Sequence, residues 1–387
     1  MRRGPTGTYE TTTTAGEAVR AFVPHALPPR PPLDLGGERQ RLLERALLAC
    51  GRLDGVSALL PDPSLFLYAY VRREALLSSQ IEGTQSSLSD LLLFELEEAP
   101  GVPLDDVVEV SNYVAALEHG LTRLGGGFPL SNRLLREIHA VLLARGRGTE
   151  KLPGEFRRSQ NWLGGTRPGN ARFVPPPPGR VEECMAALER FLHDETEPLP
   201  AIVRAAVAHV QFETIHPFLD GNGRVGRLLI ALQLHEARVL RAPLLYLSLF
   251  LKQHRSEYYA RLDAVRAQGD WEAWVEFFLE GVAVTASGAV DTAHRLLALF
   301  AEDERRLVGE GRRAPVLQRL LTALRSRPLT TIGDLAERAG VTFPTAASGA
   351  GVLVRHGIAR EITGARRNRI FAYDRYLAIL GEGGEPL

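Results

Sequence analysis

The chain has 387 residues, of which 45% are hydrophobic and 24% charged, so it has the composition of a globular protein with two or three domains. Basic and acidic residues number 46 each, and this balance excludes a chain that binds polyanions through net charge alone. Two cysteines, Cys50 and Cys184, are too few for a disulfide framework or a four-cysteine zinc site. The N-terminus turns polar at once and lacks the apolar core of a signal peptide, so we expect a cytoplasmic protein.

The first 35 residues hold a run of four threonines and a proline cluster, which predicts an extended surface segment instead of a helix. From about residue 37 onward, apolar residues recur every three or four positions, the period of an amphipathic helix. After this first helix, further helices are predicted at 64–82, 85–98, 105–124, 131–146, 180–194, 200–215, 223–238, 248–266 and 271–298. The predicted fold class is therefore mainly α.

One interval breaks the helical pattern. Residues 153–179 are rich in glycine, proline and arginine, with short apolar pieces on either side of 167–170. This composition predicts a two-stranded hairpin or an ordered loop. Loops on a rigid helical scaffold often carry function.

A basic segment follows an acidic stretch near 300–314. Twelve arginines but only four acidic residues lie between 312 and 375, in a chain that is neutral overall. The pattern predicts three helices and then two short β-like runs, at 315–326, 331–339, 344–356, 358–362 and 369–373. Three helices followed by a basic hairpin is the layout of a winged helix-turn-helix. Such a domain either contacts DNA phosphates or mediates protein contacts alone, and the sequence does not decide between the two.

The densest group of polar residues is the segment HPFLDGNGRVGR, which begins at His216. Buried helical faces are predicted on both sides, so it is a glycine-bearing loop that enters a second helix, with Asp220 or Asn222 placed to cap that helix. A helix N-terminus, glycines and the side chains of Arg224 and Arg227 together form a site for phosphate groups. Asp220 is placed to hold Mg²⁺, and His216 has a pKa suited to take a proton from a hydroxyl. These parts predict nucleotidyl or phosphoryl transfer.

Two other interpretations of this region are weaker. The loop contains the pattern Gly-x-Gly-x-x-Gly, but a dinucleotide site needs a strand before it, and here a helix is predicted. His209 and His216 lack the spacing and the adjacent glutamate of a zinc protease. We therefore expect His209 to be a histidine packed in the core.

The same segment matches, position for position, the signature His-x-Phe-x-(Asp/Glu)-Gly-Asn-Gly-Arg-x-x-Arg of the Fic domain family, which the chain resembles over most of residues 10–290. PGEFRRSQNWLGG and ARFVPPPP resemble the flap region of that family. The resemblance implies a Fic-type helical bundle with a β-hairpin flap. It divides the chain into an N-terminal part with an inhibitory helix at 1–100, a catalytic core at 101–298 and a winged helix-turn-helix domain at 312–387.

The resemblance also implies a role for each matching residue. His216 would deprotonate a Ser, Thr or Tyr hydroxyl of a target protein, which would receive AMP from ATP, while Asp220 would hold Mg²⁺. The residues expected to bind the nucleotide are Asp220, Gly221, Asn222, Gly223, Arg224 and Arg227, with Tyr258 as a candidate for the adenine pocket. Because the phosphotransferase branch of the family lacks the second motif arginine, the presence of Arg227 favours nucleotidyl transfer. Phosphocholine transfer stays open.

A second segment, SSQIEG, resembles the family's inhibitory motif (Ser/Thr)-x-x-x-Glu-(Gly/Asn). Its Ser78 and Glu82 are four residues apart and share a helix face. The resemblance implies that the Glu82 carboxylate pairs with Arg227 and takes the place of the γ-phosphate, so that bound ATP is misplaced for transfer. In some relatives the same glutamate supports removal of AMP, so a de-AMPylase is an alternative.

The hairpin around 162–174 is expected to hold a target segment through main-chain hydrogen bonds, as edge strands do. The residues expected at this docking edge are Gly165, Thr166, Arg172, Phe173 and Val174. The expected partner is a protein with an accessible hydroxyl. Self-modification, DNA at the C-terminal domain and a homodimer are open. A rival hypothesis is a DNA-binding transcriptional regulator that only senses ATP.

Overall fold

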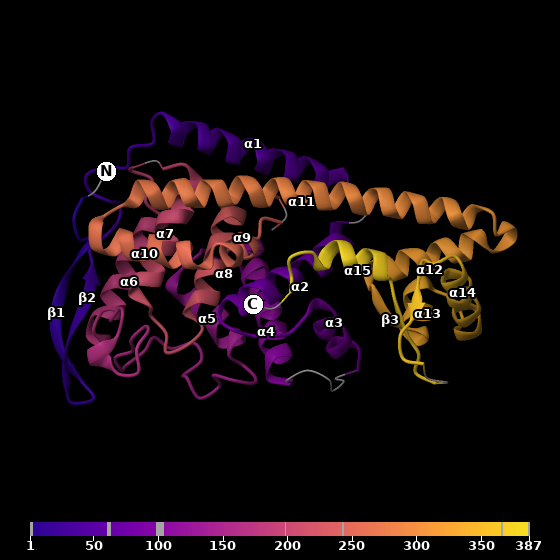
Figure 1. The fold of residues 1–387 in the computed structure, drawn as a ribbon, viewed down its shortest axis with the longest axis horizontal. Helices are drawn as coiled ribbons and strands as arrows, with labels where there is room; N and C mark the ends of the chain where they lie inside the picture. The colour runs from indigo at the N-terminus through magenta and orange to yellow at the C-terminus, as the bar shows by residue number, and fades with distance from the viewer. Residues whose placement is uncertain are drawn as a thin grey trace. The chain divides into compact units, whose positions relative to one another are not determined.

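A computed structural model describes residues 3–59, 63–97, 104–197, 199–241, 244–364 and 367–385. The fold is mainly helical, as the sequence predicts, with two small antiparallel sheets (Figure 1). The chain divides into two compact units. The first contains Met1–Gly51 and Val108–Ala286, and the second contains Arg52–Val107 and Ser287–Leu387.

The first unit opens with a β-hairpin. Strands β1 (Gly7–Thr14) and β2 (Glu17–Pro24) pair antiparallel, from Gly7 opposite Pro24 to Thr14 opposite Glu17. The sequence predicts the extended conformation of this segment correctly but not its pairing. Along β2, Val19 and the residues from Ala21 to Pro24 are buried, while Arg20 between them is exposed.

Helices form the rest of the first unit. They are α1 (Glu38–Leu59) up to Gly51, α4 (Leu104–Gly125) from Val108, α5 (Asn132–Leu142), α6 (Pro178–Leu192), α7 (Ala201–Ile215), α8 (Asn222–Glu236), α9 (Ser248–Gln253), α10 (Arg255–Gln268) and the first part of α11 (Trp271–Val308). Helix α7 is buried almost around its whole circumference and packs against α6 and α8. The predicted helix at 248–266 is divided, because α9 ends at Gln253 and α10 begins at Arg255.

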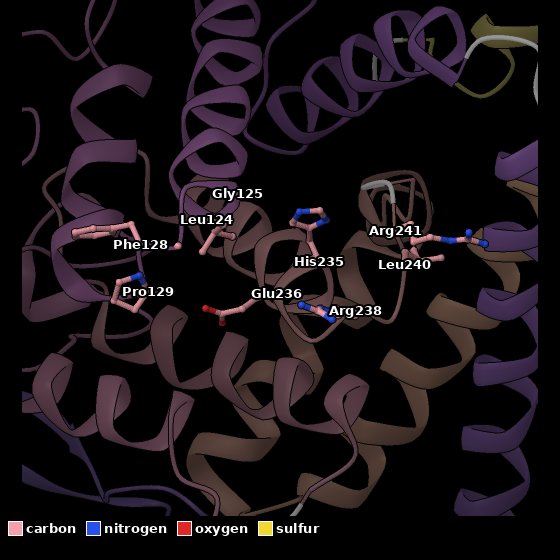
Figure 2. Close-up of a pocket in the computed structure, with 10 residues that line it drawn as sticks. Leu124, Gly125, Phe128, Pro129, His235, Glu236, Arg238, Leu240 and Arg241 are labelled. Atoms are coloured by element: carbon pink, nitrogen blue, oxygen red, sulfur yellow. The ribbon is translucent and has the colours of Figure 1, made fainter.

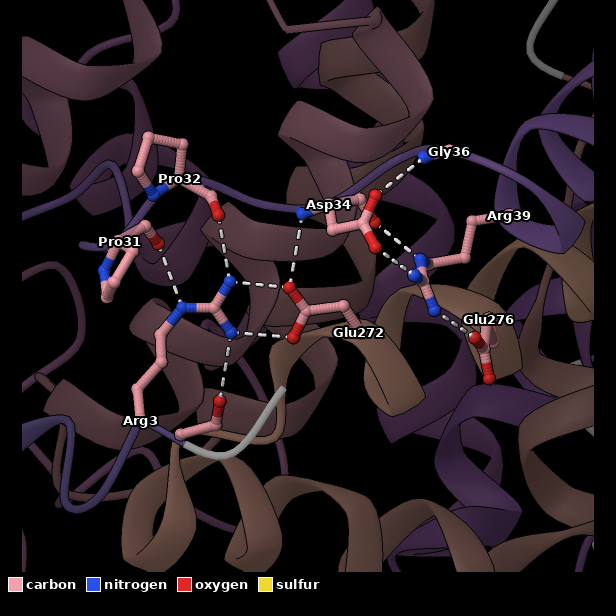
Figure 3. A network of polar contacts seen from close by, with 9 residues as sticks. Arg3, Pro31, Pro32, Asp34, Gly36, Arg39, Glu272 and Glu276 are labelled. Atoms are coloured by element: carbon pink, nitrogen blue, oxygen red, sulfur yellow. Dashed lines mark hydrogen bonds and ion pairs between the residues drawn. The ribbon is translucent and has the colours of Figure 1, made fainter.

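A polar network holds the segment ahead of α1 to the start of α11 (Figure 3). Arg3 donates to both carboxylate oxygens of Glu272 and to the carbonyls of Pro31 and Pro32. The Asp34 N–H also donates to Glu272, at 3.2 Å. Burial alone would raise the pKa of Glu272, but these donors hold it at about 2.

The second unit contains the helices α2 (Pro63–Ile81), α3 (Leu88–Glu97), α12 (Ala314–Ser326), α13 (Ile332–Ala339), α14 (Phe343–Arg355) and α15 (Asp374–Gly381). Its sheet has the order β3-β5-β4, all antiparallel, from the strands β3 (Leu329–Thr331), β4 (Arg360–Glu361) and β5 (Ile370–Ala372). Helix α2 packs against α3, α12 and α15. Strand β3 and helix α15 were not predicted, and α11 extends to Val308, beyond its predicted end at 298.

Among the described residues, α11 is the one helix long and apolar enough to cross a membrane by length and composition. Of its most apolar stretch, 56% is buried inside the protein. Core helices of water-soluble proteins pass the same test, so the length of α11 is weak support for a membrane span.

Candidate active site

The loop between α7 and α8 has a fixed backbone. His216 ends α7 in the left-handed conformation, with φ at 50°, and its N–H donates to the Phe212 carbonyl at 2.9 Å. The Asn222 side chain then closes the loop, because its Oδ1 accepts from the N–H of Phe218 and its Nδ2 donates to the Phe218 carbonyl, both at 2.8 Å. Gly221, with φ at 75°, turns the chain into α8. A non-glycine residue at this left-handed position would be strained.

The N-terminus of α8 carries no side-chain cap. The prediction that Asp220 or Asn222 caps this helix is therefore wrong. The Asn222 amide is bonded to Phe218, and Oδ1 of Asp220 accepts instead from the N–H of Gly221 at 2.6 Å. As a result, the positive end of the helix dipole is available for an anion at the loop.

His216 is held in its neutral form. Burial lowers its pKa to about 3, and the guanidinium groups of Arg157 and Arg266 lower it further, while the Glu213 carbonyl opposes them. Arg266 reaches this end of α7 through Thr214 Oγ1 at 3.1 Å and the Glu213 carbonyl at 3.2 Å. A neutral imidazole has a lone pair that accepts a proton, but a pKa this far below neutrality makes His216 a weaker base than the sequence predicts.

Arg157 is a site residue that sequence reasoning missed. Its side chain is 2% exposed and donates to the carbonyls of Ile215, His216 and Pro176 at 3.3, 2.9 and 2.6 Å. It thus satisfies the last carbonyls of α7, which have no partner within the helix. Burial lowers the pKa of Arg157 to about 10, so the guanidinium stays charged at neutral pH.

His139 supports the loop from α5 and was also missed. Its ring stacks on Phe218, with centroids 3.8 Å apart and planes 9° apart. Nδ1 accepts from the Gly154 N–H at 2.8 Å, so Nε2 carries the proton and donates to the Asp220 carbonyl at 3.1 Å. Burial lowers the pKa of His139 to about 4. In the sequence it is only one more residue on the buried face of an amphipathic helix.

The two motif arginines lie on α8 and are nearly covered, at 4% exposure each. Arg224 forms an ion pair with Glu109 of α4 at 2.7 Å and lies 3.7 Å from Oδ1 of Asp220. A phosphate that contacted Arg224 would have to share it with the Glu109 carboxylate. Arg227 lies one turn further along the same helix.

Asp220 is the carboxylate that the loop presents to solvent, with a side chain that is 44% exposed. Over the part of the chain that the structure describes, no cluster of three or more metal-binding side chains occurs. Mg²⁺ in phosphate-transfer sites is often held by one or two carboxylates together with phosphate oxygens. A single carboxylate in this position fits that donor set.

The predicted flap is a narrow hairpin closed by one bridge. Leu163 and Phe173 pair antiparallel, and the Leu163 N–H donates to the Phe173 carbonyl at 2.8 Å. Gly165, Thr166 and Arg172 are exposed near its tip. The base of the flap is tied to the active-site loop, because Asn161 Nδ2 donates to the Phe218 carbonyl at 3.1 Å.

Val174 does not lie at an open docking edge. Its side chain is buried with Val19 and Ala21 of β2, and its carbonyl accepts from the N–H of Phe22 at 2.9 Å. It anchors the flap to the N-terminal hairpin, since its main chain is already hydrogen-bonded there. Phe173 lies beneath the Arg266 guanidinium, 4.1 Å from its ring centroid.

The structure places Tyr258 in the core. Its ring is 1% exposed, and its hydroxyl lies 2.9 Å from Nε2 of His209. His209 is fully buried and also contacts the Gly226 carbonyl at 3.0 Å, which confirms the predicted core histidine. The predicted adenine contact of Tyr258 would need an exposed ring face, and this packing covers the ring.

The segment SSQIEG, which resembles the inhibitory motif of the Fic family, lies in the second unit at the end of α2. Ser78 is fully buried in the last turn, and Glu82 follows directly after Ile81, where it is exposed. Gly83, with φ at 110°, then turns the chain away.

A separate pocket of about 720 Å³ lies at the other end of α8 (Figure 2). One wall is formed by the end of α4 and the residues after it, and the other by the end of α8 and the residues after it. The lining residues are Leu124, Gly125, Gly127, Phe128, Pro129, His235, Glu236, Arg238, Leu240 and Arg241. His235 is 13 residues from Asn222, roughly 20 Å along a helix, so this pocket is not part of the loop site.

Two family models match the chain. Residues 40–122 match the model described as Fic/DOC family N-terminal, and residues 129–234 match the model described as Fic/DOC family. The second match contains the flap, α7, the loop and all of α8 except its last two residues.

The chain is also similar to curated and solved proteins. It is 33% identical over 204 residues to the protein adenylyltransferase Fic of Culex quinquefasciatus, and 30% identical over 203 residues to that of Drosophila melanogaster. Each match covers 52% of this chain but only 38% of the relative, so the chain spans less than half the length of these relatives.

Among solved structures, a Fic family protein from Desulfovibrio desulfuricans G20 matches 89% of this chain and 98% of its own, with a TM-score of 0.56 at 21% identity. A fragment of Fic-1 from C. elegans matches 66% of this chain and 70% of its own, with a TM-score of 0.50 at 26% identity. The first of these likenesses supports the fold alone.

Proposed function

Because this chain belongs to the Fic/DOC family, we propose that it is a protein adenylyltransferase, which transfers AMP from ATP to a Ser, Thr or Tyr hydroxyl. The observation that carries the proposal is the position of His216 at the end of α7, where a loop leads into the N-terminus of α8, which has no side-chain cap. One group takes a proton, and the other attracts phosphate oxygens.

In the proposed reaction, the target hydroxyl oxygen forms a bond to the α-phosphorus of ATP. The bond between that phosphorus and the bridging oxygen of the β-phosphate breaks, and pyrophosphate leaves with the electron pair. The hydroxyl proton passes to His216, whose lowered pKa keeps the imidazole neutral beforehand. The first N–H groups of α8 and the side chains of Arg224 and Arg227 would stabilise charge on the phosphates.

Mg²⁺ would neutralise part of the charge on the phosphates, and Asp220 is the residue proposed to hold it. The exposed carboxylate of Asp220 supports this role. At the flap, the exposed residues Gly165, Thr166 and Arg172 are proposed to lie beside the target segment. The N–H groups of Thr166 and Arg172 already donate within the flap, to Asn170 Oδ1 and to the Leu163 carbonyl, so these two residues would contact the target through other atoms.

We further propose that Glu82 restrains the enzyme. Its support is the spacing of Ser78 and Glu82 and the exposure of Glu82 where α2 ends. An exposed carboxylate at a helix end is able to pair with a guanidinium of the nucleotide site and so displace the γ-phosphate. Removal of AMP by water, oriented by the same carboxylate, is the alternative direction.

A second candidate function is regulation of transcription through DNA. The order α12, β3, α13, α14, β4, β5 is proposed to be a winged helix-turn-helix, and exposed arginines at 312, 313 and 319 accompany the exposed Thr345 and Ser348 of α14. Such a surface is suited to phosphate contacts. Salt-dependent DNA binding without any covalent product would favour this candidate over the enzyme.

The test uses ATP labelled at the α-phosphate with Mg²⁺, and three purified proteins: wild type, Glu82→Gly, and Glu82→Gly with His216→Ala. We expect strong covalent label only on the single variant. Equal label on the double variant would contradict the role of His216. Label on none of the three, with ATP still bound, would favour the ATP-sensing regulator. A cytoplasmic location belongs to the same proposal and is checked by fractionation of cells.

A further inference from the structure

Within the second unit, a short backbone segment lies along α2, the helix that carries the inhibitory motif. Nη2 of Arg73 donates to the carbonyl of Glu382 at 2.7 Å, and Nε2 of Gln80 donates to the carbonyl of Gly384 at 2.9 Å. A Cβ placed on Gly384 would lie 3.9 Å from a methyl carbon of Leu76. Because Gln80 is 1% and Arg73 9% exposed, these contacts are shielded from water.

The segment Gly381–Glu385 contacts only one face of α2 with these bonds. Arg73, Leu76 and Gln80 follow one another at three- and four-residue steps, so their side chains share a face. Glu82 follows the last residue of α2, Ile81, and is exposed there. The segment therefore holds α2 through the face that carries Arg73, Leu76 and Gln80, just ahead of Glu82.

The position of this segment depends on the C-terminal half of the second unit. The carboxylate of Glu382 forms an ion pair with Arg295 of α11, at 2.5 Å, but these side chains are 56% and 49% exposed, so the pair contributes little to the position of the segment. Just ahead of α15, the Tyr373 hydroxyl donates to the buried Asp303 of α11 at 2.5 Å. Helix α15 itself packs against α2. A displacement of the C-terminal elements would therefore pull on the carbonyls that hold Gln80 and Arg73.

We propose that Gly381–Glu385 is a clamp that keeps α2 in the position from which Glu82 restrains AMP transfer. This inference rests on the proposed function. In this proposal the C-terminal elements control the restraint, because any displacement of Gly381–Glu385 from α2 releases the last turns of that helix. Loss of one clamp hydrogen bond should shift the balance between held and released helix on the order of fivefold.

The experiment measures transfer of label from α-labelled ATP by the full-length protein. Gln80→Leu removes the bond to Gly384 at nearly constant volume, together with a second bond of Nε2 to the Ser86 carbonyl at 2.9 Å. Arg73→Met removes the bond to Glu382 and leaves the Ser86 bond in place, so it tests the clamp by itself. Both are expected to raise labelling about fivefold over wild type. Glu382→Ala is the matched control, because it removes the ion pair with Arg295 but keeps both backbone carbonyls. We expect its labelling to stay within about twofold of wild type.

Two reference proteins separate the possible failures. If Glu82→Gly carries no label, the proposed function fails, whatever the clamp variants do. If Glu82→Gly is labelled while Gln80→Leu and Arg73→Met stay at the wild-type rate, the clamp is refuted. The double variant with Gln80→Leu and Glu82→Gly should match Glu82→Gly alone. A higher rate would also overturn the proposal, because Gln80 would then act outside the restraint.

Discussion

Replacing Arg157 by methionine should destabilise the first unit and the active-site loop together. The change deletes the donors for the carbonyls of Ile215, His216 and Pro176, which lie in a region that solvent scarcely reaches. A buried carbonyl left without a donor costs about 1–3 kcal/mol. Methionine avoids the desolvation of a buried charge, so we expect a net loss of about 3 kcal/mol. For a unit of this size, that corresponds to a fall in Tm of roughly 6–12 °C.

The assay is thermal unfolding followed by circular dichroism, with Arg158→Met as the matched control. The Arg158 side chain is 80% exposed and pairs only with Glu155, itself 43% exposed. Such surface pairs contribute well under about 1 kcal/mol. Labelling by the Arg157 variant should fall as well, because the backbone that carries His216 loses its support. A Tm for Arg157→Met within about 2 °C of that for Arg158→Met would refute this account.

Three further predictions concern the core around α7. Gly226→Ala should lower the free energy of unfolding, measured with urea, by about 1–3 kcal/mol, because the new Cβ would lie 2.3 Å from a carboxylate oxygen of α7. The control Gly288→Ala should be neutral or stabilising, because no atom lies within 4 Å of its new Cβ. Tyr258→Phe should lower the free energy of unfolding by about 1 kcal/mol and leave KM for ATP unchanged. A raised KM would indicate that Tyr258 does contact the nucleotide. The urea concentration at the unfolding midpoint should be lower at pH 5 than at pH 7. Burial lowers the pKa of His139 to about 4 and of His209 to about 3, so at pH 5 the unfolded chain binds protons that the folded chain does not. Equal midpoints at the two pH values would contradict this.

The helices were predictable because their signal is local. Apolar periodicity located α7 and α8, and Pro217 and the glycines located the loop between them. The domain division predicted between 298 and 312 falls on the acidic residues after 300, yet Glu302, Asp303 and Glu304 belong to α11. Asp303 is fully buried there and accepts from the Tyr373 hydroxyl, so the run is a helix whose acids meet residues about 70 positions away. Periodicity within one window carries no information on such partners.

The supports of the site could not be predicted for the same reason. Arg157 and Arg158 are identical neighbours in the sequence, but one is 2% exposed and the other lies in solvent. Which of the two arginines contacts the carbonyls of Ile215 and His216 depends on where the end of α7 lies in the folded chain. The hairpin β1–β2 shows the same limit, because its threonines favour an extended chain but do not identify the strand that pairs with them.

The loop separates groups that hold its shape from groups that are open to a ligand. Arg157, His139 and Asn222 each have their polar atoms bonded to the loop or its flanks, whereas His216 and the α8 N-terminus are the parts left to act on phosphate and hydroxyl. Removing a group of the first kind should lower both Tm and labelling, since an unsupported backbone misplaces the base. Removing the His216 imidazole should abolish labelling while Tm changes little. The motif alone does not tell these two kinds apart, because Asn222 belongs to it and yet binds back to Phe218.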